Sequence, residues 1–359
     1  MFSNKHVWGS FLLAALASAG SAQAAPAYAY RATALVPFTP GQGSGIATMI
    51  NNRGLVCGQL ASNNGFCSYR GTVTQLHALA GDSWGLPGGL NELNQVVGYS
   101  YGPDTPGSAV IFVAGQARRL AVASQPGSSA TDINNLGQIV GGLSDGVGNK
   151  AFVSWHGTVR ELGTLGGPRP IGAASGINDL GQIVGSVSAP NSSPEAADLI
   201  GFLYQHGVMR ALPTPAGYAS AAVRINVLGH VVGSIEAMGA GFETRRATLW
   251  KNGVLQTLLD EPSDARGINN LGQVVGGTYE REGGFLYTPG LGVRNLNALI
   301  DPAPGYRLIY PQDINDLGQI VGFGCKADLC GPMRLDPVFL PTAVAGGADD
   351  PGLMRSGEQ

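Results

Sequence analysis

The nine residues INNLGQIVG, from Ile133 to Gly141, are the stretch of this sequence that decides its fold. Related nonapeptides occur at seven places along the 359-residue chain. In order they are INNRGLVCG from Ile50, LNELNQVVG from Leu90, INNLGQIVG from Ile133, INDLGQIVG from Ile177, INVLGHVVG from Ile225, INNLGQVVG from Ile268 and INDLGQIVG from Ile314. The motif asparagines are 40, 43, 44, 48, 43 and 46 residues apart, so the chain is built from repeats with a mean length of 44 residues.

The nonapeptide has the composition of a tight turn between two strands. Asn134 is expected to accept hydrogen bonds from its own turn backbone, and Gly137 to supply the positive φ that closes a type I turn with a G1 bulge. The copy without this glycine has Asn94, the next best residue for that conformation. The residues that follow start the return strand, and the final glycine of the motif marks a place where backbones crowd.

A second pattern follows the nonapeptides: an apolar and aromatic strand, a turn, and another strand that ends in leucine. It is clearest in GFCSYRGTVTQL from Gly65, AFVSWHGTVREL from Ala151, GFLYQHGVMRAL from Gly201 and ATLWKNGVLQTL from Ala247. Val, Phe, Trp and Tyr favour strands, and His-Gly or Asn-Gly pairs favour the turn between them. Each unit therefore contains four short strands and no helical period.

Four-stranded units of this length are typical of a β-propeller, so the predicted fold is all-β, with seven blades of four antiparallel strands. The strand before each motif is rich in small residues, as in Ala173-Ala174-Ser175-Gly176, which suits the crowded innermost position. The strand that ends in leucine is expected to be outermost. The competing fold is an open solenoid, which would expose both terminal blades.

The two ends of the chain are predicted to share the last blade. One more strand is evident after the seventh nonapeptide, around Val338, Phe339 and Leu340, so that blade lacks an outer strand. Tyr30 to Phe38, ahead of the first nonapeptide, is a strand without a blade. We expect it to complete the last blade and close the ring, which protects the sheet edges.

The N-terminus is typical of a secretory signal peptide. Lys5 precedes an apolar run from Val7 to Ala19, and Ser21 to Ala24 supplies the small residues of a cleavage site. The run is shorter than the roughly 20 residues needed to cross a bilayer. We therefore predict residues 1–24 as a cleaved signal peptide, 25–345 as one propeller domain and 346–359 as a disordered tail. The protein is expected in the periplasm or outside the cell, without a transmembrane segment in the mature chain.

Composition and cysteine content agree with export. Charged residues make up 13% of the chain and the formal net charge is −3, which gives no electrostatic reason to bind nucleic acid. Four cysteines in an oxidising space predict two disulfides, for which three connectivities exist. Local structure favours Cys57 with Cys67 across a hairpin and Cys325 with Cys330 around a short loop. No histidine lies near either pair at the spacing of a zinc site.

These motifs resemble the HAF-type extracellular repeat proteins of bacteria, whose units carry an IN-x-x-G-Q-V-V-G motif, a His-Ala-Phe strand and a G-T-L-G-G segment. The seven nonapeptides extend the resemblance over nearly all of the mature chain, and Leu162 to Gly167 matches the third element. The histidine is absent, because Lys150, Ile200 and Gly283 stand in its place. The resemblance implies an exported repeat fold and brings no established activity or catalytic residue.

The repeated residues predict no catalytic group, metal site or cofactor. Asp132 to Gly137 and Asp313 to Gly318 partly match a calcium loop, but leucine occupies the third ligand position and no glutamate follows at the right spacing. No G-x-S-x-G, phosphate-loop or dinucleotide-loop motif occurs. A Ser-His-Asp arrangement assembled from distant positions stays open, because triads are defined by geometry.

Ligand contacts are expected at one end of the central channel, on crossover loops six to eight positions before each motif. Aromatic and arginine side chains can stack on sugar rings or anchor protein surfaces. The candidates are Trp84, Arg169, Tyr218, Glu261, Tyr306 and Arg307. At the opposite mouth Asp132, Arg224 and Asp313 precede motif isoleucines and are expected to pair with one another as structural groups.

We therefore predict an exported, non-catalytic propeller that acts as a binding or scaffold module, with a glycan or an envelope protein as its partner. The alternative is a hydrolase or lyase acting on polysaccharide, with acids such as Asp260, Glu261 and Asp264 on one crossover loop. A third possibility is a purely structural exported protein. The sequence leaves the ligand, the oligomeric state and the final compartment undetermined.

Overall fold

The computed structural model describes residues 29–37, 45–62, 64–121, 127–144, 146, 148–167, 171–190 and 198–338. The chain divides into two units, Tyr28–Phe339 and a second one made of Met1–Ala27 and Leu340–Gln359. The second unit lies outside the described residues. The predicted signal peptide 1–24 and the predicted tail 346–359 fall within it and remain predictions.

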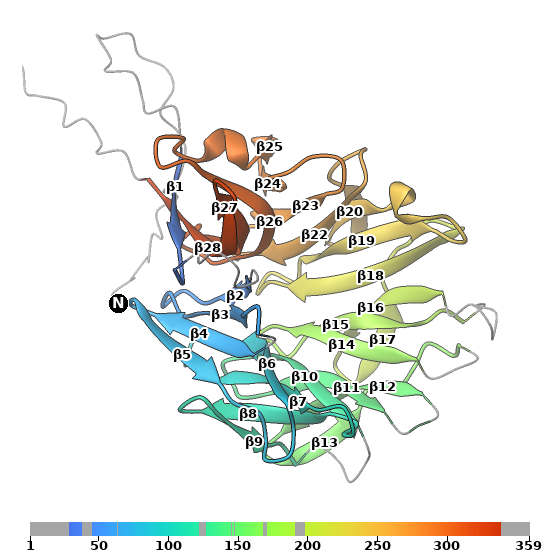
Figure 1. The fold of residues 1–359 in the computed structure, drawn as a ribbon. Coiled ribbons are helices and arrows are strands. Elements are labelled where there is room, and N and C mark those ends of the chain that lie inside the picture. The colour runs from blue at the N-terminus through green and yellow to red at the C-terminus, as the bar shows by residue number, and fades with distance from the viewer. Residues whose placement is uncertain are drawn as a thin grey trace, which may run out of the picture. The chain divides into compact units, whose positions relative to one another are not determined.

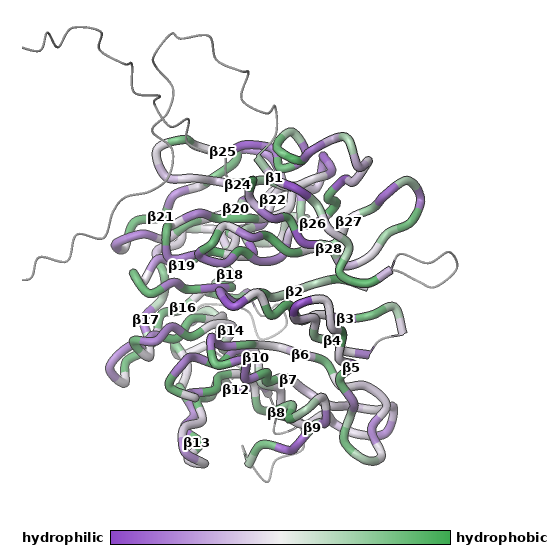
Figure 2. Tube along the Cα trace, turned by 90° about the vertical axis from the view of Figure 1, so that its left-hand side faces the viewer, coloured by the Kyte–Doolittle hydropathy of each residue, from purple (hydrophilic) through white to green (hydrophobic). Residues whose placement is uncertain are grey.

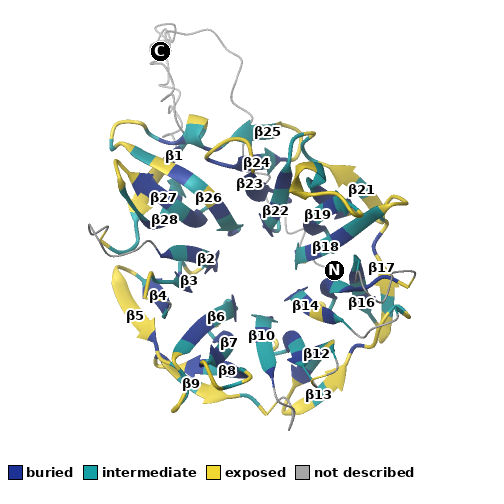
Figure 3. Ribbon diagram, turned by 45° about the vertical axis from the view of Figure 1, so that its right-hand side comes forward, coloured by how far each residue is buried: buried dark blue, intermediate teal, exposed yellow. Residues whose placement is uncertain are grey.

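The first unit is a β-propeller whose described residues form seven four-stranded antiparallel sheets (Figure 1). The seven blades are arranged in a ring, with the first strand of each blade facing the centre (Figure 3). Each blade packs against the next, and β2 of the first blade contacts β26 and β27 of the last. The predicted fold class is confirmed.

Six blades consist of four consecutive strands each. Blade 1 is β2 (Ile46–Ile50), β3 (Val56–Gln59), β4 (Gly65–Tyr69) and β5 (Thr72–Leu76), and blade 2 is β6 (Trp84–Leu90), β7 (Val96–Tyr101), β8 (Ser108–Val113) and β9 (Gln116–Arg119). Blade 3 is β10 (Ser128–Ile133), β11 (Ile139–Ser144), β12 (Asn149–Trp155) and β13 (Thr158–Glu161), and blade 4 is β14 (Gly172–Ile177), β15 (Ile183–Ser188), β16 (Leu199–Gln205) and β17 (Val208–Ala211). Blade 5 is β18 (Tyr218–Ile225), β19 (Val231–Ala237), β20 (Arg246–Lys251) and β21 (Val254–Thr257), and blade 6 is β22 (Ser263–Ile268), β23 (Val274–Thr278), β24 (Phe285–Thr288) and β25 (Gly292–Asn295). Two short 3-10 helices, η1 (Phe242–Thr244) and η2 (Asn297–Leu299), lie between strands.

The ring closes with one strand from the N-terminal side. Blade 7 is β26 (Tyr306–Ile314), β27 (Ile320–Lys326), β28 (Leu329–Pro337) and, outermost, β1 (Tyr30–Ala34). β1 pairs antiparallel with β28, from Tyr30 opposite Pro337 to Ala34 opposite Met333. The predicted closure is therefore confirmed, although β1 ends at Ala34 and the predicted end at Phe38 lies outside the described residues.

The third strand of blade 7 lies earlier in the chain than predicted. The prediction placed it around Val338, Phe339 and Leu340, whereas β28 ends at Pro337 and the last two of those residues lie outside the described part. Gly331 and Pro332 within β28 argue for a loop by composition, because proline cannot donate to a ladder. Here the carbonyl oxygen of Pro332 accepts the N–H of Leu35 at 3.0 Å, beyond the end of β1.

Each nonapeptide forms the turn between the first and second strands of its blade, as predicted. In blade 3 the N–H of Gly137 donates to the carbonyl oxygen of Asn134 at 3.1 Å, and the N–H of Asn134 donates to that of Gln138 at 3.1 Å. Gly137 has a φ of 77°. A Cβ on Gly141 would collide with the carbonyl oxygen of Ser129 on the first strand, which explains the final glycine of the motif.

Every first strand contains a β-bulge that the sequence did not predict. The bulge residues are Thr48, Gly88, Thr131, Ser175, Val223, Arg266 and Gln312. A bulge inserts one extra residue and re-aims the side chains beside it. At two of these bulges Thr48 with Met49, and Val223 with Arg224, line the central cavity.

The core repeats with the blades. Phe66, Phe152, Phe202 and Phe285 occupy the same place in the third strands of blades 1, 3, 4 and 6, and each is fully buried. Apolar and polar stretches alternate along the blades (Figure 2). Neighbouring blades share clusters, as where Val184 of blade 4 packs with Trp250 of blade 5, so each sheet buries both faces against its neighbours.

Both disulfides predicted from the local sequence are formed. Cys57 on β3 is bonded to Cys67 on β4, and Cys325 on β27 to Cys330 on β28. They stabilise blades 1 and 7, the two blades that meet where the ring closes.

Candidate functional site

Seven buried asparagines form a closed ring of hydrogen bonds at one end of the channel, which we call the lower mouth. In blade 3, Nδ2 of Asn134 donates to the carbonyl oxygen of Asn178 in blade 4 at 3.0 Å. The same bond links every blade to the next, and Asn315 of blade 7 donates to Asn51 of blade 1 at 3.0 Å. The seven donors are Asn51, Asn91, Asn134, Asn178, Asn226, Asn269 and Asn315.

The same side chains also hold their own turns. Oδ1 of Asn134 accepts the N–H groups of Leu136 and Gln138 at 3.1 and 2.9 Å. Aspartate would accept these bonds, but it has no donor for the neighbouring blade. The bonds between blades therefore explain why all seven copies have asparagine at this position. From the sequence, only the role of this asparagine in the turn was predicted.

The next residue of each motif makes a second, incomplete ring. The backbone N–H of Asn135 donates to Oδ1 of Asp179 at 2.9 Å, and Nδ2 of Asn135 donates to Oδ2 at 2.7 Å. Equivalent bonds link blade 1 to 2, 2 to 3, 5 to 6, 6 to 7 and 7 to 1. The link from blade 4 to blade 5 is missing among the described residues, because Val227 offers no acceptor to the N–H of Asp179.

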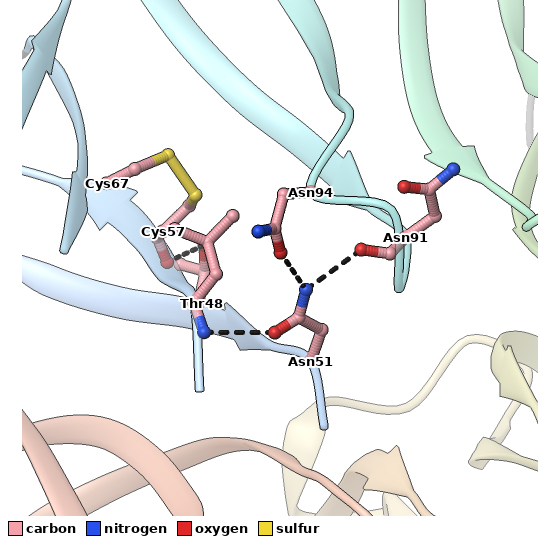
Figure 4. Close-up of a disulfide and its surroundings, with 7 residues drawn as sticks. Thr48, Asn51, Cys57, Cys67, Asn91 and Asn94 are labelled. Carbon is pink, nitrogen blue, oxygen red and sulfur yellow. Dashed lines mark hydrogen bonds between the residues drawn. A yellow bond between two sulfur atoms is a disulfide. The ribbon is translucent and has the colours of Figure 1, made fainter. Parts of the chain in front are cut away.

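Blade 1 departs from the asparagine pattern, and blade 2 compensates. In five blades Nδ2 of the ring asparagine also donates to the glutamine four residues on, as Asn134 does to Oε1 of Gln138 at 2.7 Å. Blade 1 has Leu55 at this position, and Asn51 donates instead to Oδ1 of Asn94 at 2.7 Å (Figure 4). Asn94, with a φ of 61°, is the residue that replaces the turn glycine. It supplies the acceptor that its neighbour lacks.

Three charged residues lie next to the asparagine ring. Oδ2 of Asp132 accepts the N–H of Ile177 at 2.9 Å, and Oδ2 of Asp313 accepts the N–H of Ile50 at 3.1 Å, so each carboxylate joins its blade to the next. Burial raises the pKa of Asp132 and raises that of Asp313 to about 6, while the positive charge of Arg224 lowers both. Nη1 of Arg224 donates to two backbone carbonyl oxygens. The expected mutual pairing is thus an electrostatic interaction, and the hydrogen bonds of these side chains go to the backbone.

Glycines make room for these carboxylates. A Cβ on Gly267 would lie 2.8 Å from the Cα of Asp313, and a Cβ on Gly89 would collide with Asp132. Both glycines occupy the position of the aspartate in the preceding blade. An alternation of glycine with a larger residue around the channel therefore allows the buried charges.

The lower mouth holds a cavity of about 190 Å³ lined by the two motif rings and the three charged residues. Glu92, Asp179 and Asp316, all at the third motif position, bring further carboxylates to it. Burial raises the pKa of Glu92, and a hydrogen bond from the backbone of Asn52 lowers it. The negative charges of Asp316 and Asp179 raise the pKa further. The carboxylates at this mouth therefore interact with one another.

A larger cavity of about 760 Å³ lies above the ring and shares Arg224 with the lower one. Its wall carries side chains that do not repeat from blade to blade, among them Tyr99, Glu236, Arg245, Asp264 and Arg266. Its volume is in the range of small-molecule sites.

Five polar side chains of blades 5 and 6 form a continuous network at this cavity. Arg245 pairs with Glu236, Nη2 to Oε2, at 2.6 Å, and Arg266 contacts both oxygens of Asp264 at 3.0 and 3.1 Å. The hydroxyl of Tyr279 joins the two pairs, accepting from Arg245 at 3.2 Å and donating to Asp264 at 3.3 Å. The guanidinium and carboxylate groups are thereby held in fixed positions at the cavity wall.

The candidate residues were predicted on crossover loops, but Trp84, Tyr218, Tyr306 and Arg307 begin the first strands of their blades, and only Glu261 of the described ones lies in a loop. None of these five lines the large cavity. The half-buried Trp84 stacks against Tyr101, with ring centroids 5.0 Å apart, and Tyr218 packs into the core of blade 5. Tyr306 lies under the ammonium group of Lys326, and Arg307 pairs with Glu282 at 3.0 Å. Glu261 pairs with Arg281. Arg169 lies outside the described residues, and a ligand role for these six residues stays a prediction.

The acids of the enzyme alternative are separated by their environments. Asp260 is exposed, Glu261 is bound to Arg281, and Asp264 lines the large cavity with Arg266 beside it. The residues of the cavity that sequence reasoning missed include Arg245 and Arg266. Arg266 occupies the bulge of β22 and lies two residues after Asp264, which lines the same cavity.

The described residues offer neither a metal-binding cluster nor a membrane-spanning helix. They contain no group of three or more His, Cys, Asp or Glu side chains placed to hold a metal ion. A helix with the length and apolar character needed to cross a membrane is also absent from this part of the chain.

No family model matches the chain, and no curated protein matches it. Among solved structures, the fold is similar to streptogramin B lyase, with a TM-score of 0.56 and 11% identity over 88% of this chain and 100% of that one. It is also similar to the β-propeller domain of the Trilobed protease from Pyrococcus furiosus, with a TM-score of 0.53 and 9% identity over 82% of this chain and 94% of that one. A third similar structure is YCF48 bound to D1 peptide, with a TM-score of 0.51 and 11% identity over 86% and 96% of the two chains. At such identities the likeness shows the propeller fold alone.

The way in which the ring closes can be set beside that of the Pyrococcus domain. That domain has an open velcro topology. In the present chain β1 completes blade 7, and the asparagine ring joins blade 7 to blade 1 a second time.

Proposed function

We propose that the protein is an exported, non-catalytic binding module whose ligand occupies the 760 Å³ cavity. The observation that carries this proposal is the contrast between repeated and unrepeated residues. The repeated asparagines and glycines are used by turns and by contacts between blades, whereas the cavity wall carries the unrepeated Glu236, Arg245, Asp264 and Arg266. Side chains that vary between structurally equivalent blades are free to specialise for a ligand.

The ligand class that this wall suits is a short glycan. Paired carboxylate and guanidinium groups offer acceptors and donors side by side, which matches the neighbouring hydroxyl groups of a sugar. Tyr99 adds a half-buried ring to the same wall, next to Tyr101 at 5.6 Å. Aromatic and arginine faces are also common anchors for protein partners, so an envelope protein is the second ligand to test.

Export is supported by the N-terminal sequence and by the cysteines. Both disulfides lie within hairpins of adjacent strands, and such bonds persist in oxidising compartments. The seven nonapeptides also support membership of the HAF-type repeat proteins, which we include in the proposal.

A glycan array followed by calorimetry on the exported chain tests the proposal. We expect a glycan to bind, and Arg266→Ala and Arg245→Ala each to weaken its binding about tenfold, because each removes a fixed charged donor. Arg210→Ala is the matched control, because Arg210 is exposed on β17, the outer strand of blade 4, away from the cavity wall.

Two results would count against the proposal. Absence of any bound glycan or envelope protein would favour a purely structural role. Release of reducing ends from a polysaccharide, lost in Asp264→Asn, would favour the enzyme alternative.

A further inference from the structure

The fourth motif residue is an exposed leucine in six of the seven copies. A turn tip in contact with water normally carries polar residues, so a repeated apolar side chain there requires an explanation. Neither the positive φ of the turn nor the asparagine bonds involve this side chain. The exposed fractions are 56% for Leu93, 57% for Leu136, 72% for Leu180, 60% for Leu228, 55% for Leu271 and 56% for Leu317.

These leucines form a discontinuous circle around the lower mouth, which we call the leucine circle. Each turn is bonded to the next through its first motif asparagine, so neighbouring tips stay side by side around the channel. Blade 1 interrupts the circle with Arg53. The circle is therefore a fixed apolar surface that the fold holds open to solvent.

Negative charge lies inside the circle. The mouth is lined by five carboxylates, from Glu92, Asp132, Asp179, Asp313 and Asp316, and by one guanidinium, that of Arg224. Arg53 adds one further positive charge at the rim. With the five acids ionised and both arginines charged, the mouth carries a formal charge of −3.

We propose that the leucine circle and the acidic mouth within it form a docking surface for a segment of another protein in which lysine or arginine side chains alternate with apolar ones. The cationic side chains enter the mouth and the apolar ones contact the leucines. This surface lies at the end of the channel opposite the 760 Å³ cavity, so the proposal is independent of the glycan.

Charge argues against the other occupants of such a surface. Two copies of this chain facing each other through their lower mouths would bring like charges together, which costs several kcal/mol in a contact. An anionic membrane surface would be repelled in the same way. Residues 346–359 carry Asp349, Asp350 and Glu358 against Arg355, so this segment has the wrong sign as well.

The probe for the test is a fluorescein-labelled twelve-residue peptide in which leucine and lysine alternate, measured by fluorescence anisotropy against the exported chain. We expect binding that weakens as salt rises, because exposed charges are screened. The double variant Leu136→Ser/Leu180→Ser should bind about tenfold more weakly, since apolar anchors dominate such contacts. Asp179→Asn should weaken binding mainly at low salt, and amides at the same position in blades 1, 3 and 6 show that the fold accepts this change.

Three controls make the result decisive. Val254→Ser removes an apolar side chain of similar exposure, 65%, from an outer strand and should leave binding unchanged. Arg266→Ala should leave it unchanged as well, which separates this surface from the glycan cavity. A peptide with glutamate in place of lysine should not bind. Urea unfolding of each variant establishes that the fold is retained.

The proposal is overturned if the lysine peptide does not bind, or binds equally to Leu136→Ser/Leu180→Ser. It is also overturned if the same leucine variant abolishes self-association in sedimentation, which would identify a second copy as the occupant. Binding to phosphatidylglycerol vesicles that exceeds binding to the peptide would identify a membrane instead.

Discussion

Substituting Asn134 by aspartate tests whether the ring bonds between blades stabilise the propeller. Asn134→Asp keeps Oδ1, which holds the turn, and removes the Nδ2 donor. Two hydrogen bonds are lost, to the carbonyl oxygen of Asn178 at 3.0 Å and to Oε1 of Gln138 at 2.7 Å. The side chain is 3% exposed, so water does not replace the lost partners.

The size of the stability loss depends on whether each of the two acceptors can find another hydrogen-bond donor. Gln138 can turn its amide and donate to the new carboxylate, whereas the carbonyl oxygen of Asn178 cannot move and faces a negative charge. A buried group left without its partner costs about 1 to 3 kcal/mol, and more when a charge is involved. We therefore expect the free energy of unfolding to fall by about 2 to 4 kcal/mol at pH 7.

The loss should depend on pH with a defined sign. Burial beside a carbonyl oxygen raises the folded-state pKa of the introduced carboxyl above its unfolded value of about 3.9. The penalty is complete above the folded-state pKa and shrinks as pH falls toward about 4, where the protonated carboxyl becomes a donor.

Urea unfolding followed by tryptophan fluorescence at pH 7 and at pH 4.5 measures both effects. Asn149→Asp is the matched control, because Asn149 is exposed at the start of β12 and its change should cost less than about 0.5 kcal/mol. Asn315→Asp should cost as much as Asn134→Asp, since the ring is closed. Equal unfolding midpoints for Asn134→Asp and Asn149→Asp would refute the stabilising role of the ring.

Three further predictions concern stability. Val227→Asn supplies the acceptor that the N–H of Asp179 lacks, so the urea midpoint should rise, by about 0.5 to 1.5 kcal/mol in unfolding free energy; an unchanged midpoint would contradict the second ring. Replacing Cys57 and Cys67 together by alanine should lower the free energy of unfolding by about 2 to 3 kcal/mol, because the disulfide closes a loop of 10 residues in the unfolded chain. An unchanged urea midpoint after reduction of the wild-type disulfides would contradict this prediction. The folded-state pKa of Asp313, about 6, lies above its unfolded value, so this carboxyl makes the protein less stable as pH rises from 4 to 6. Asp313→Asn should remove about 3 kcal/mol of that dependence, and a pH profile identical to the wild type would disprove the assignment.

The sequence predicted the blades because their determinants are local. Turn residues such as Asn134 and Gly137 act within a few positions of each other, and their spacing counts the repeats directly. The closing strand was also predictable, since Tyr30 and its neighbours had no blade of their own. The position of β28 was predicted wrongly because Pro332 and the residue before it suggest a loop. The sheet accommodates them next to a segment from the other end of the chain, where the carbonyl oxygen of Pro332 accepts a hydrogen bond.

The site was less predictable, because its features join residues of different repeats. The second role of Asn94 exists because Leu55, in the preceding blade, lacks an amide. The bulges next to Arg224 and at Arg266 have no characteristic composition, since the bulge residue differs in nearly every blade. Trp84 was chosen for its residue type on a predicted loop, and the structure places it at the start of β6, outside the wall of the large cavity.

The closing strand has a consequence for the order in which the molecule can be assembled. Of the strands that the structure describes, β1 is synthesised first and its partner β28 last. Tyr30 precedes its partner Pro337 by 307 positions. Between the synthesis of β28 and its pairing with β1, the free edge of β28 can accept the β1 of another chain. Folding at low concentration favours pairing of β1 with β28 of the same chain, whereas refolding at high concentration should give chains linked by exchanged first strands.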